Sequence, residues 1–297
     1  MALAIGVAVV VLLKPAQATF PGVPGKIAYV GGDEIHTIWP GGSGDRQITT
    51  DTPVGARAPA YSPDGSRIAY VSYDRSPGHE LDYEVFTMTA DGGNMRQISE
   101  TETDTGASSP AYSPDGSRIA YSSDDFSPTL EFDSEIYTVK AGDGSGTLQL
   151  THNTKYDYSP SYSPDGRRIA YVSHDGNTSE IYTIKVGGGD KRRVTNNTRR
   201  EDDPDYSPGG WRIAYSSYDG NDFEIYTIKV GGGDRKQVTN NARNDGSPSY
   251  SPGGWRIAYH SYDGNDSEIY TIRTDGQDRR QVTNNSTRDV SPSWGSR

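Results

Sequence analysis

One repeated segment dominates the sequence. Arg-Ile-Ala-Tyr at residues 67–70 recurs four more times, and a divergent copy, Lys-Ile-Ala-Tyr, begins at Lys26. The tyrosines that end these segments are spaced 41, 51, 50, 44 and 44 residues apart; they are Tyr29, Tyr70, Tyr121, Tyr171, Tyr215 and Tyr259. A repeat of this length indicates that each copy is one structural unit packed against its neighbours.

The repeat contains four short elements that have the composition of β-strands. In one copy they are residues 168–173, 180–185, 192–195 and the segment Pro-x-Tyr-Ser that begins at Pro204. Such elements are rich in Ile, Val, Tyr and Thr, and Gly, Pro, Asn and Asp separate them. Ser62-Pro63-Asp64-Gly65 matches a type I turn, with Pro second and Gly fourth. No helical period follows residue 18, so we expect an all-β fold.

The order of the elements predicts a single six-bladed β-propeller with four antiparallel strands in each blade. Two elements of each repeat are apolar on both alternating faces and should be covered on both sides. The element rich in Arg, Lys and Gln fits an exposed outer edge. A linear solenoid is the alternative. The chain ends favour a ring, because the C-terminal strand around Trp294 can complete the sheet that contains residues 27–29.

The N-terminal 18 residues differ from the rest of the chain. Residues 2–13 are an unbroken apolar or small run, too short to span a bilayer, and Ala16-Gln17-Ala18 follows it as a small-x-small cleavage pattern. We expect a signal peptide at 1–18 and the propeller at 19–297. A buried N-terminal helix or strand is the alternative. The leader predicts a periplasmic or secreted protein with no membrane span after its removal.

Composition excludes several classes of function. The chain carries 29 Lys and Arg against 40 Asp and Glu, a formal charge of −11, which argues against a nucleic-acid partner. It has no Cys, hence no disulfide or thiolate site, and its 21 Tyr argue against disorder. None of the five histidines forms a pair with metal-ligand spacing, and no serine lies in a nucleophile motif. We therefore expect no enzyme and no cofactor.

Acidic residues recur at one position of the repeat. Three residues before the Pro of the innermost strand stand Asp157, Glu201, Asp245 and Asp289, whereas two other copies have Ala. That position enters the strand nearest the axis, so we expect these carboxylates at the mouth of the channel, facing a ligand or a basic group of a partner. The alternative is local turn chemistry, in which Asp accepts hydrogen bonds from nearby backbone.

The loops of the last three repeats have opposite charges at the two expected ends of the ring. Those at 174–179, 218–223 and 262–267 contain no Lys or Arg and hold five acidic residues; they are Asp175, Asp219, Asp222, Asp263 and Asp266. Their Asp-Gly-Asn segments leave a Ca²⁺ role open, although turns commonly contain Asp-Gly. The opposite loops, at 185–193, 229–236 and 273–280, sum to +3, +2 and +1. We expect an electrostatic dipole along the axis.

The repeat Ser-Pro-Asp-Gly-x-Arg-Ile-Ala-Tyr, with Glu-Ile-Tyr-Thr and Arg-Gln-Val-Thr after it, resembles the TolB-type propeller repeat over about residues 21–297. The resemblance implies a six-bladed exported propeller that works by protein association. The α/β domain that precedes the propeller in TolB has no counterpart in the sequence. We expect a non-catalytic binding or scaffold protein, a monomer, that takes a protein or peptide with basic groups at the channel mouth. The alternative is a secreted lyase or lactonase-like enzyme acting on saccharides or lactones.

Overall fold

The computed structural model describes residues 23–50, 55–73, 83–100, 106–126, 132–174, 177–262 and 264–296. The expected signal peptide at 1–18 lies outside these ranges. Within them every regular element is a β-strand, as the sequence predicts. The described part of the chain contains no helix that is long and apolar enough to cross a membrane.

Three of the sheets contain four antiparallel strands each, in chain order. One holds β4 (Arg57–Tyr61), β5 (Arg67–Tyr73), β6 (Tyr83–Thr89) and β7 (Arg96–Gln97). The next holds β16 (Glu201–Tyr206), β17 (Arg212–Tyr218), β18 (Phe223–Lys229) and β19 (Lys236–Gln237). The third holds β20 (Asp245–Tyr250), β21 (Arg256–Tyr262), β22 (Ser267–Arg273) and β23 (Arg280–Gln281).

An eight-stranded sheet consists of two further units of the same kind. The first unit is β8 (Ala107–Tyr112), β9 (Arg118–Phe126), β10 (Phe132–Lys140) and β11 (Leu148–Gln149). The second is β12 (Tyr156–Tyr162), β13 (Arg168–His174), β14 (Ser179–Lys185) and β15 (Arg192–Arg193). A single parallel pair, Ser134 with Tyr156, joins β10 to β12. The units therefore keep the four-strand pattern of the repeat.

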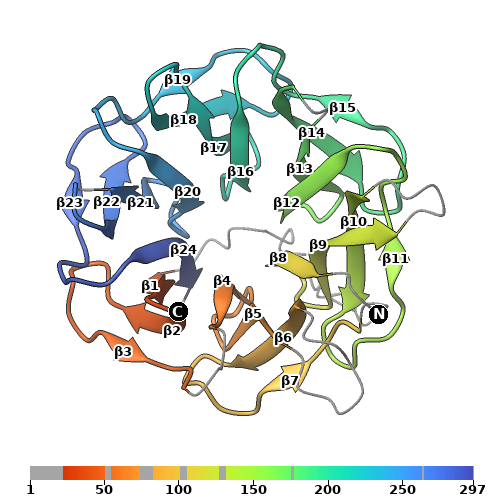
Figure 1. Ribbon diagram of the computed structural model, residues 1–297, viewed down its shortest axis with the longest axis horizontal. Helices are drawn as coiled ribbons and strands as arrows, with labels where there is room; N and C mark the ends of the chain where they lie inside the picture. Colours follow the sequence, from red (N-terminus) through yellow and green to blue (C-terminus); the bar gives the residue numbers. More distant parts are fainter. Residues whose placement is uncertain are drawn as a thin grey trace, which may run out of the picture.

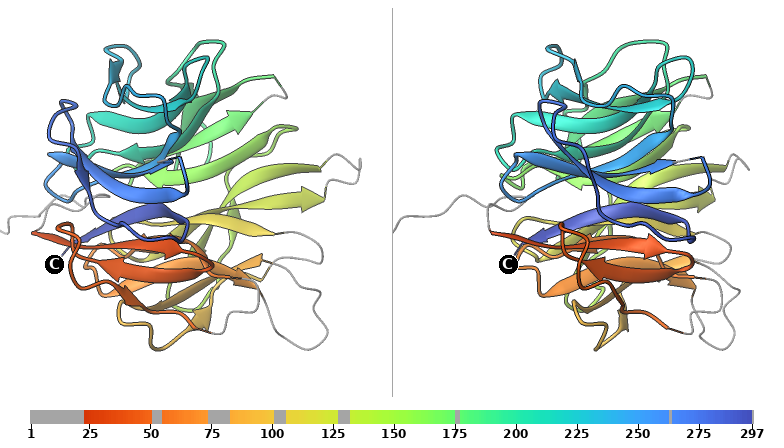
Figure 2. Two further views of the ribbon diagram at one scale, coloured as in Figure 1. Left: turned by 60° about the vertical axis from the view of Figure 1, so that its left-hand side comes forward. Right: turned by 90° about the vertical axis from the view of Figure 1, so that its left-hand side faces the viewer.

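The remaining sheet joins the two ends of the described chain. Its order is β24 (Asp289–Ser296), β1 (Pro24–Gly31), β2 (Glu34–Ile38) and β3 (Arg46–Gln47). Ile27 pairs with Trp294, which confirms that the C-terminal strand lies in the sheet of residues 27–29. Figure 1 shows the units placed radially around a central opening, with β4, β8, β12, β16, β20 and β24 innermost. In Figure 2 the strands run between the two ends of this arrangement.

The turns follow the predicted chemistry. In Ser62-Pro63-Asp64-Gly65 the Gly65 N–H donates to the Ser62 carbonyl at 2.9 Å, which closes the turn. Asp64 Oδ1 accepts from the Ser62 hydroxyl at 2.6 Å and from the Ser66 N–H at 3.1 Å. Gly65 has φ of 68°, a conformation that glycine adopts without strain. Local sequence thus fixes the connection between the innermost strand and the next strand.

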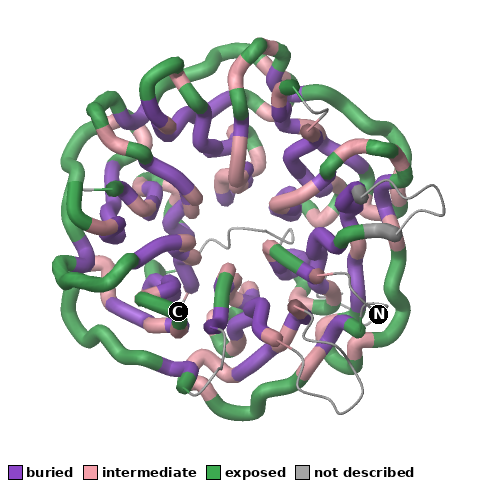
Figure 3. Tube along the Cα trace, viewed as in Figure 1, coloured by how far each residue is buried: buried purple, intermediate pink, exposed green. Residues whose placement is uncertain are grey.

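The hydrophobic core lies between neighbouring units. One cluster combines Ala170, Val172 and Ile181 of one unit with Tyr206 and Ile213 of the next. These side chains are buried because β13 and β14 are apolar on both faces, as the sequence indicated. Figure 3 shows buried residues in the strands and exposed residues along the outer loops. Each unit therefore depends on its neighbours for burial.

Hydrogen bonds also connect adjacent innermost strands. The residue after the strand Pro accepts the backbone N–H of an aromatic residue in the next unit. Ser161 accepts from Tyr206 at 3.3 Å, Asp205 from Tyr250 at 2.8 Å, Ser249 from Trp294 at 3.0 Å and Ser293 from Tyr61 at 3.1 Å. The last of these bonds links the C-terminal strand β24 to β4. The same contact therefore connects the sheet that contains both chain ends to the following unit.

Candidate functional site

A narrow cavity of about 200 Å³ lies among the innermost strands. It is lined by the Pro of each strand and the residues on either side; these segments are 58–60, 109–111, 159–161, 203–205, 247–249 and 291–293. The residue before each Pro has φ between 48° and 52°; these residues are Ala58, Ser109, Ser159, Asp203, Ser247 and Ser291. Strand register shifts at the same place, as between Tyr158 and Ser161. A β-bulge thus bends each innermost strand along the channel.

Strand β16 differs from the other innermost strands in its charge. It places Asp203 and Asp205 where the other segments have Ser or Ala, and among the described residues that line the cavity only these two are charged. Asp203 Oδ1 accepts from the Ser159 hydroxyl at 3.1 Å and its Oδ2 from the Ser247 hydroxyl at 3.0 Å. Asp203 therefore bridges the units on both sides and places a carboxylate at the cavity.

Asp205 is a carboxylate in a position where serine fulfils the same structural role. Its Oδ2 accepts the Tyr250 N–H, the bond that Ser161, Ser249 and Ser293 make in other units. Burial raises the pKa of Asp205 to about 7, although the hydrogen bonds act in the opposite direction. Because serine forms this bond without the desolvation cost of a carboxylate, the acidic group is not required by the fold. Displaced pKa values of this kind are frequent at functional sites.

His260 lies within electrostatic reach of Asp203. It belongs to β21 and pairs with Gly246 of β20, where a Cβ atom would stand 2.7 Å from the imidazole Cε1. Burial lowers the pKa of His260 to about 4. The charge of Asp203 raises this pKa, and the charge of Arg288 lowers it further. The imidazole is therefore neutral at pH 7. Its Nδ1 atom is buried and has no hydrogen-bond partner among the described residues.

The four carboxylates expected at the channel mouth are buried instead. Asp157, Glu201, Asp245 and Asp289 each have 0% exposure, and none lines the channel cavity. Each accepts a side-chain hydrogen bond from the Asn four residues earlier; the donors are Asn153, Asn197, Asn241 and Asn285, at 2.7 to 2.8 Å. The structure thus places these residues in an internal network and not on an open rim. The donor in each of these bonds is an Asn side chain, whereas the predicted turn has a backbone N–H as the donor.

The same Asn residues connect two carboxylates of successive units. The backbone N–H of Asn197 donates to Glu180 of β14 at 2.7 Å, while its side chain binds Glu201 of β16. Asn241 connects Glu224 to Asp245 in the same manner. Burial raises the pKa of Glu201 and of Glu224 to about 7. The crossover between units is therefore held by carboxylates that burial makes hard to ionise.

Cationic side chains partly compensate these buried groups. Arg235 lies over the Tyr226 ring at 3.6 Å from its centroid and donates to the Tyr215 hydroxyl and to Ser217, both at 2.9 Å. Its charge lowers the pKa of Glu201, against the larger effect of burial. Arg279 occupies the equivalent place in the next unit. These contacts assign the carboxylates of the crossover a role in stability.

The structure covers the expected acidic loops only in part. Asp175 and Asp263 lie outside the described residues. Asp219 accepts the Asn221 N–H at 2.9 Å, as in an Asx-turn, and Asp222 is 9% exposed with its pKa raised by burial. Asp266 is half-buried. In the described part of the chain, no three His, Cys, Asp or Glu side chains are grouped so that they could hold a metal ion.

Asp203, Asp205 and His260 were not singled out from the sequence, although a signal was present. The innermost strand reads Glu-Asp-Asp-Pro-Asp-Tyr in β16 but Asp-Gly-Ser-Pro-Ser-Tyr in β20. A comparison of each repeat position shows the two Ser-to-Asp differences beside the Pro. The acidic position shared by four repeats pointed to Glu201 and its equivalents, but these residues are buried.

Comparison with known proteins places the chain in a family. The TolB beta propeller domain matches residues 42–297. No curated protein sequence matches significantly. TolB from Acinetobacter baumannii is 21% identical, with a TM-score of 0.79 over 92% of this chain and 67% of that one. A putative TolB from Agrobacterium tumefaciens is 23% identical, with a TM-score of 0.67 over 87% of this chain and 89% of that one.

The same fold also occurs in the structure of an enzyme. Hydrazine synthase from Kuenenia stuttgartiensis is 15% identical, with a TM-score of 0.74 over 92% of this chain and 47% of that one. Likeness at this identity concerns the fold alone, so the neighbour leaves the activity of this chain open. The match over residues 42–297, together with the repeated four-stranded sheets, shows that the chain belongs to the TolB beta-propeller domain family.

Proposed function

We propose that the protein is an exported, non-catalytic binding propeller whose central channel receives a basic side chain from a segment of a partner protein or peptide. The observation that carries this proposal is the pair Asp203 and Asp205, the charged residues of a cavity of about 200 Å³. A cavity of this size suits one lysine or arginine side chain. Complementary charge in a confined site favours such a partner and orients it.

The channel requires a closed ring, and we propose that the repeated sheets form six blades closed by β24. The pairing of β24 with β1 and the bond from the Tyr61 N–H to Ser293 support closure. The leader pattern at 1–18 supports export to the periplasm or beyond the cell. In this account the buried acids of the crossovers keep the blades together, while Asp203 and Asp205 meet the ligand.

A secreted enzyme is the second candidate, because one observation favours it. Asp205 and His260 have displaced pKa values in or beside the channel, as catalytic groups often do. The size of the cavity argues against saccharide or lactone chemistry at this place. Small-molecule sites usually enclose about 300 to 1,000 Å³, more than this cavity offers. Binding of a protein segment therefore remains the better-supported function.

Replacing Asp203 and Asp205 together with Ser tests the proposal by affinity capture. Serine is the residue at the equivalent positions 247 and 249, where Ser249 keeps the bond between units, so the variant should fold. With the chain as bait in a native periplasmic or secreted fraction, the wild type should retain a partner that D203S/D205S retains at least ten-fold less, as measured by quantitative mass spectrometry.

The variant Asp219→Asn is the control for a general loss of charge. Asp219 lies in an end loop and accepts a backbone N–H, which asparagine can also do. Its capture profile should equal that of the wild type. Recovery of the same proteins in the same amounts by D203S/D205S and by the wild type would contradict a role of the channel in binding.

A further inference from the structure

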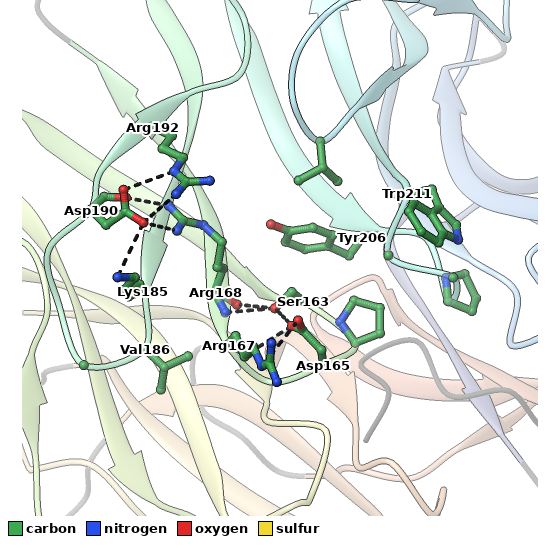
Figure 4. Close-up of a pocket in the computed structure, with 16 residues that line it drawn as sticks. Ser163, Asp165, Arg167, Arg168, Lys185, Val186, Asp190, Arg192, Tyr206 and Trp211 are labelled. Atoms are coloured by element: carbon green, nitrogen blue, oxygen red, sulfur yellow. Dashed lines mark hydrogen bonds and ion pairs between the residues drawn. The ribbon is translucent and has the colours of Figure 1, made fainter. Parts of the chain in front are cut away.

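A larger cavity lies at the opposite end of the sheets from the Asp-rich loops. It has a volume of about 910 Å³, within the usual range for small-molecule sites, and lies between the β12–β15 unit and the β16–β19 unit. Strands β13 and β14 end at the pair His174 and Ser179 on the side of the Asp-rich loop. This cavity adjoins the pair Arg168 and Lys185, at the other end of the same two strands. Figure 4 shows its lining.

One side of this groove is cationic. Asp190 accepts from Arg168 at 2.9 Å and from Arg192 at 2.8 Å, and Lys185 lies 3.6 Å away. The Arg192 and Lys185 side chains are 66% and 61% exposed, so their remaining hydrogen-bond donors can reach a ligand. The lining as a whole holds four cationic and two acidic side chains, a net charge of +2. The groove therefore favours an anion while it still offers carboxylate acceptors.

The other side presents an exposed indole. Trp211 lies across the groove from the cationic cluster in Figure 4, and 79% of its surface is exposed. Its turn is closed by the Gly210 N–H bond to Ser207 at 2.8 Å, as in the Ser62 turn, where Ser66 occupies the equivalent position. The turn therefore forms without an aromatic side chain. Trp211 adds apolar surface that the fold does not bury.

Gly209 leaves room for the indole ring of Trp211. A Cβ atom at Gly209 would lie 2.9 Å from Cδ1 of Trp211, and the equivalent residue in the preceding unit is Asp165. The change from Asp to Gly therefore makes room for the ring against the backbone of the turn. Two linked differences from the repeat thus place a flat apolar surface beside the cationic cluster.

An equivalent groove elsewhere in the molecule shows that these features are not required by the repeat. The groove between the β4–β7 and β8–β11 units has a volume of about 570 Å³ and is lined by the same kind of turn. Its charged lining is Asp64, Asp115, Arg67 and Arg96, which sum to zero, and the residue equivalent to Trp211 in the second unit is Ser117. The indole and the net positive charge therefore distinguish the groove at Trp211 from this groove, while a second exposed tryptophan, Trp255, lies in the equivalent turn of the next unit.

We propose that this groove binds an acidic saccharide, a chain that contains uronic acid residues. The apolar face of a sugar ring can lie on the indole of Trp211. A uronate carboxylate can bind Nη1 of Arg192 and the ammonium of Lys185, because Nε and Nη2 of Arg192 already donate to Asp190. Sugar hydroxyls can donate to the carboxylates of Asp165 and Asp190. An acidic peptide would instead bring its own carboxylates next to these groups, and the like charges would repel each other. This mixture of donors, acceptors and a flat apolar face favours the saccharide. The site is separate from the channel.

Calorimetric titration of the full chain with tetragalacturonate tests the proposal. The wild type should bind this probe, and Trp211→Ser should bind it at least ten-fold more weakly, because serine keeps the turn and removes the platform. The matched control is Trp255→Ser, since Trp255 is 78% exposed in the same turn of the next unit but does not line the groove. That variant should bind within two-fold of the wild type. Lys185→Gln with Arg192→Gln should weaken binding at least ten-fold.

Three outcomes would overturn the proposal. The first is that wild-type chain does not bind tetragalacturonate at millimolar concentration. The second is an equal loss in W211S and W255S, which would show that binding is not specific to the Trp211 groove. The third is equal binding of a tetraglutamate peptide, which would show a general attraction of anions. Melting temperatures of all variants within about 3 °C of the wild type exclude misfolding as a cause of lost binding.

Discussion

A chain that ends at Thr287 is expected to lose most of its stability. The truncation removes β24, which pairs with β1 and buries Val290 and Trp294 to 7% and 6% exposure. Loss of a buried aromatic side chain alone costs about 3 to 5 kcal/mol. Because proteins of this kind have a total stability of about 5 to 15 kcal/mol, the remaining chain should be largely unfolded at 37 °C.

Thermal unfolding followed by circular dichroism measures this effect. The control is a chain that ends at Ser296, which keeps all of β24. Its melting temperature should equal that of the full chain, whereas the chain ending at Thr287 should melt at least 15 °C lower or show no cooperative transition. An unchanged melting temperature after removal of β24 would refute the dependence of the fold on this strand.

Stability should fall as the pH rises from about 4.5 to about 8. Burial raises the pKa of Glu135, Glu201 and Glu224 from 4.5 to about 7. In this interval the unfolded chain has released these protons while the folded chain still binds them, so each unit of pH favours unfolding. Arg side chains lower the pKa of Asp190 and Asp278 to about 2, so the stability these groups contribute is complete above about pH 4 and is lost only as the pH falls toward 2; it does not change between about pH 4.5 and pH 8.

The variant Glu201→Gln isolates one of these groups. Glutamine has no titrating proton, and its side-chain oxygen can still accept from Asn197 and Ser217. Relative to the wild type, its free energy of unfolding should increase by about 2 to 3 kcal/mol between pH 4.5 and pH 8, since one pKa unit corresponds to about 1.4 kcal/mol. Urea denaturation of both proteins at pH 4.5 and pH 8 measures this difference. If the free energies of unfolding of E201Q and the wild type differ by the same amount at both pH values, Glu201 ionises normally in the folded protein.

The repeat predicted much of the fold because its signals are local. Alternation and turn residues identified the strands, and the position of Trp294 relative to the first repeat predicted the pairing of β24 with β1. The polar third element forms a two-residue outer strand, as in Arg192–Arg193. These features depend on neighbouring residues and on the order of the elements, which the sequence displays directly.

The location of the acidic residues could not be predicted in the same way. In a regular strand the side chains alternate between faces, but the bulge between Asp202 and Asp205 interrupts that alternation. Counting residues back from the Pro therefore predicted an exposed position for Glu201, which is buried. The bond from Asn197 was a local signal, because this residue lies four positions before Glu201, but the contact with Arg235 of an outer loop forms only when the whole unit folds. Tertiary contacts of this kind have no local signature.

The central claim, that Asp203 and Asp205 receive a basic side chain in the channel, is tested most directly by calorimetric titration with a tetralysine peptide. The wild type should bind the peptide more tightly at pH 8 than at pH 5.5, because Asp205, with a pKa of about 7, is ionised only at the higher value. D203S/D205S should bind it at least ten-fold more weakly at pH 8. Equal affinity of wild type and D203S/D205S at pH 8 would contradict the claim.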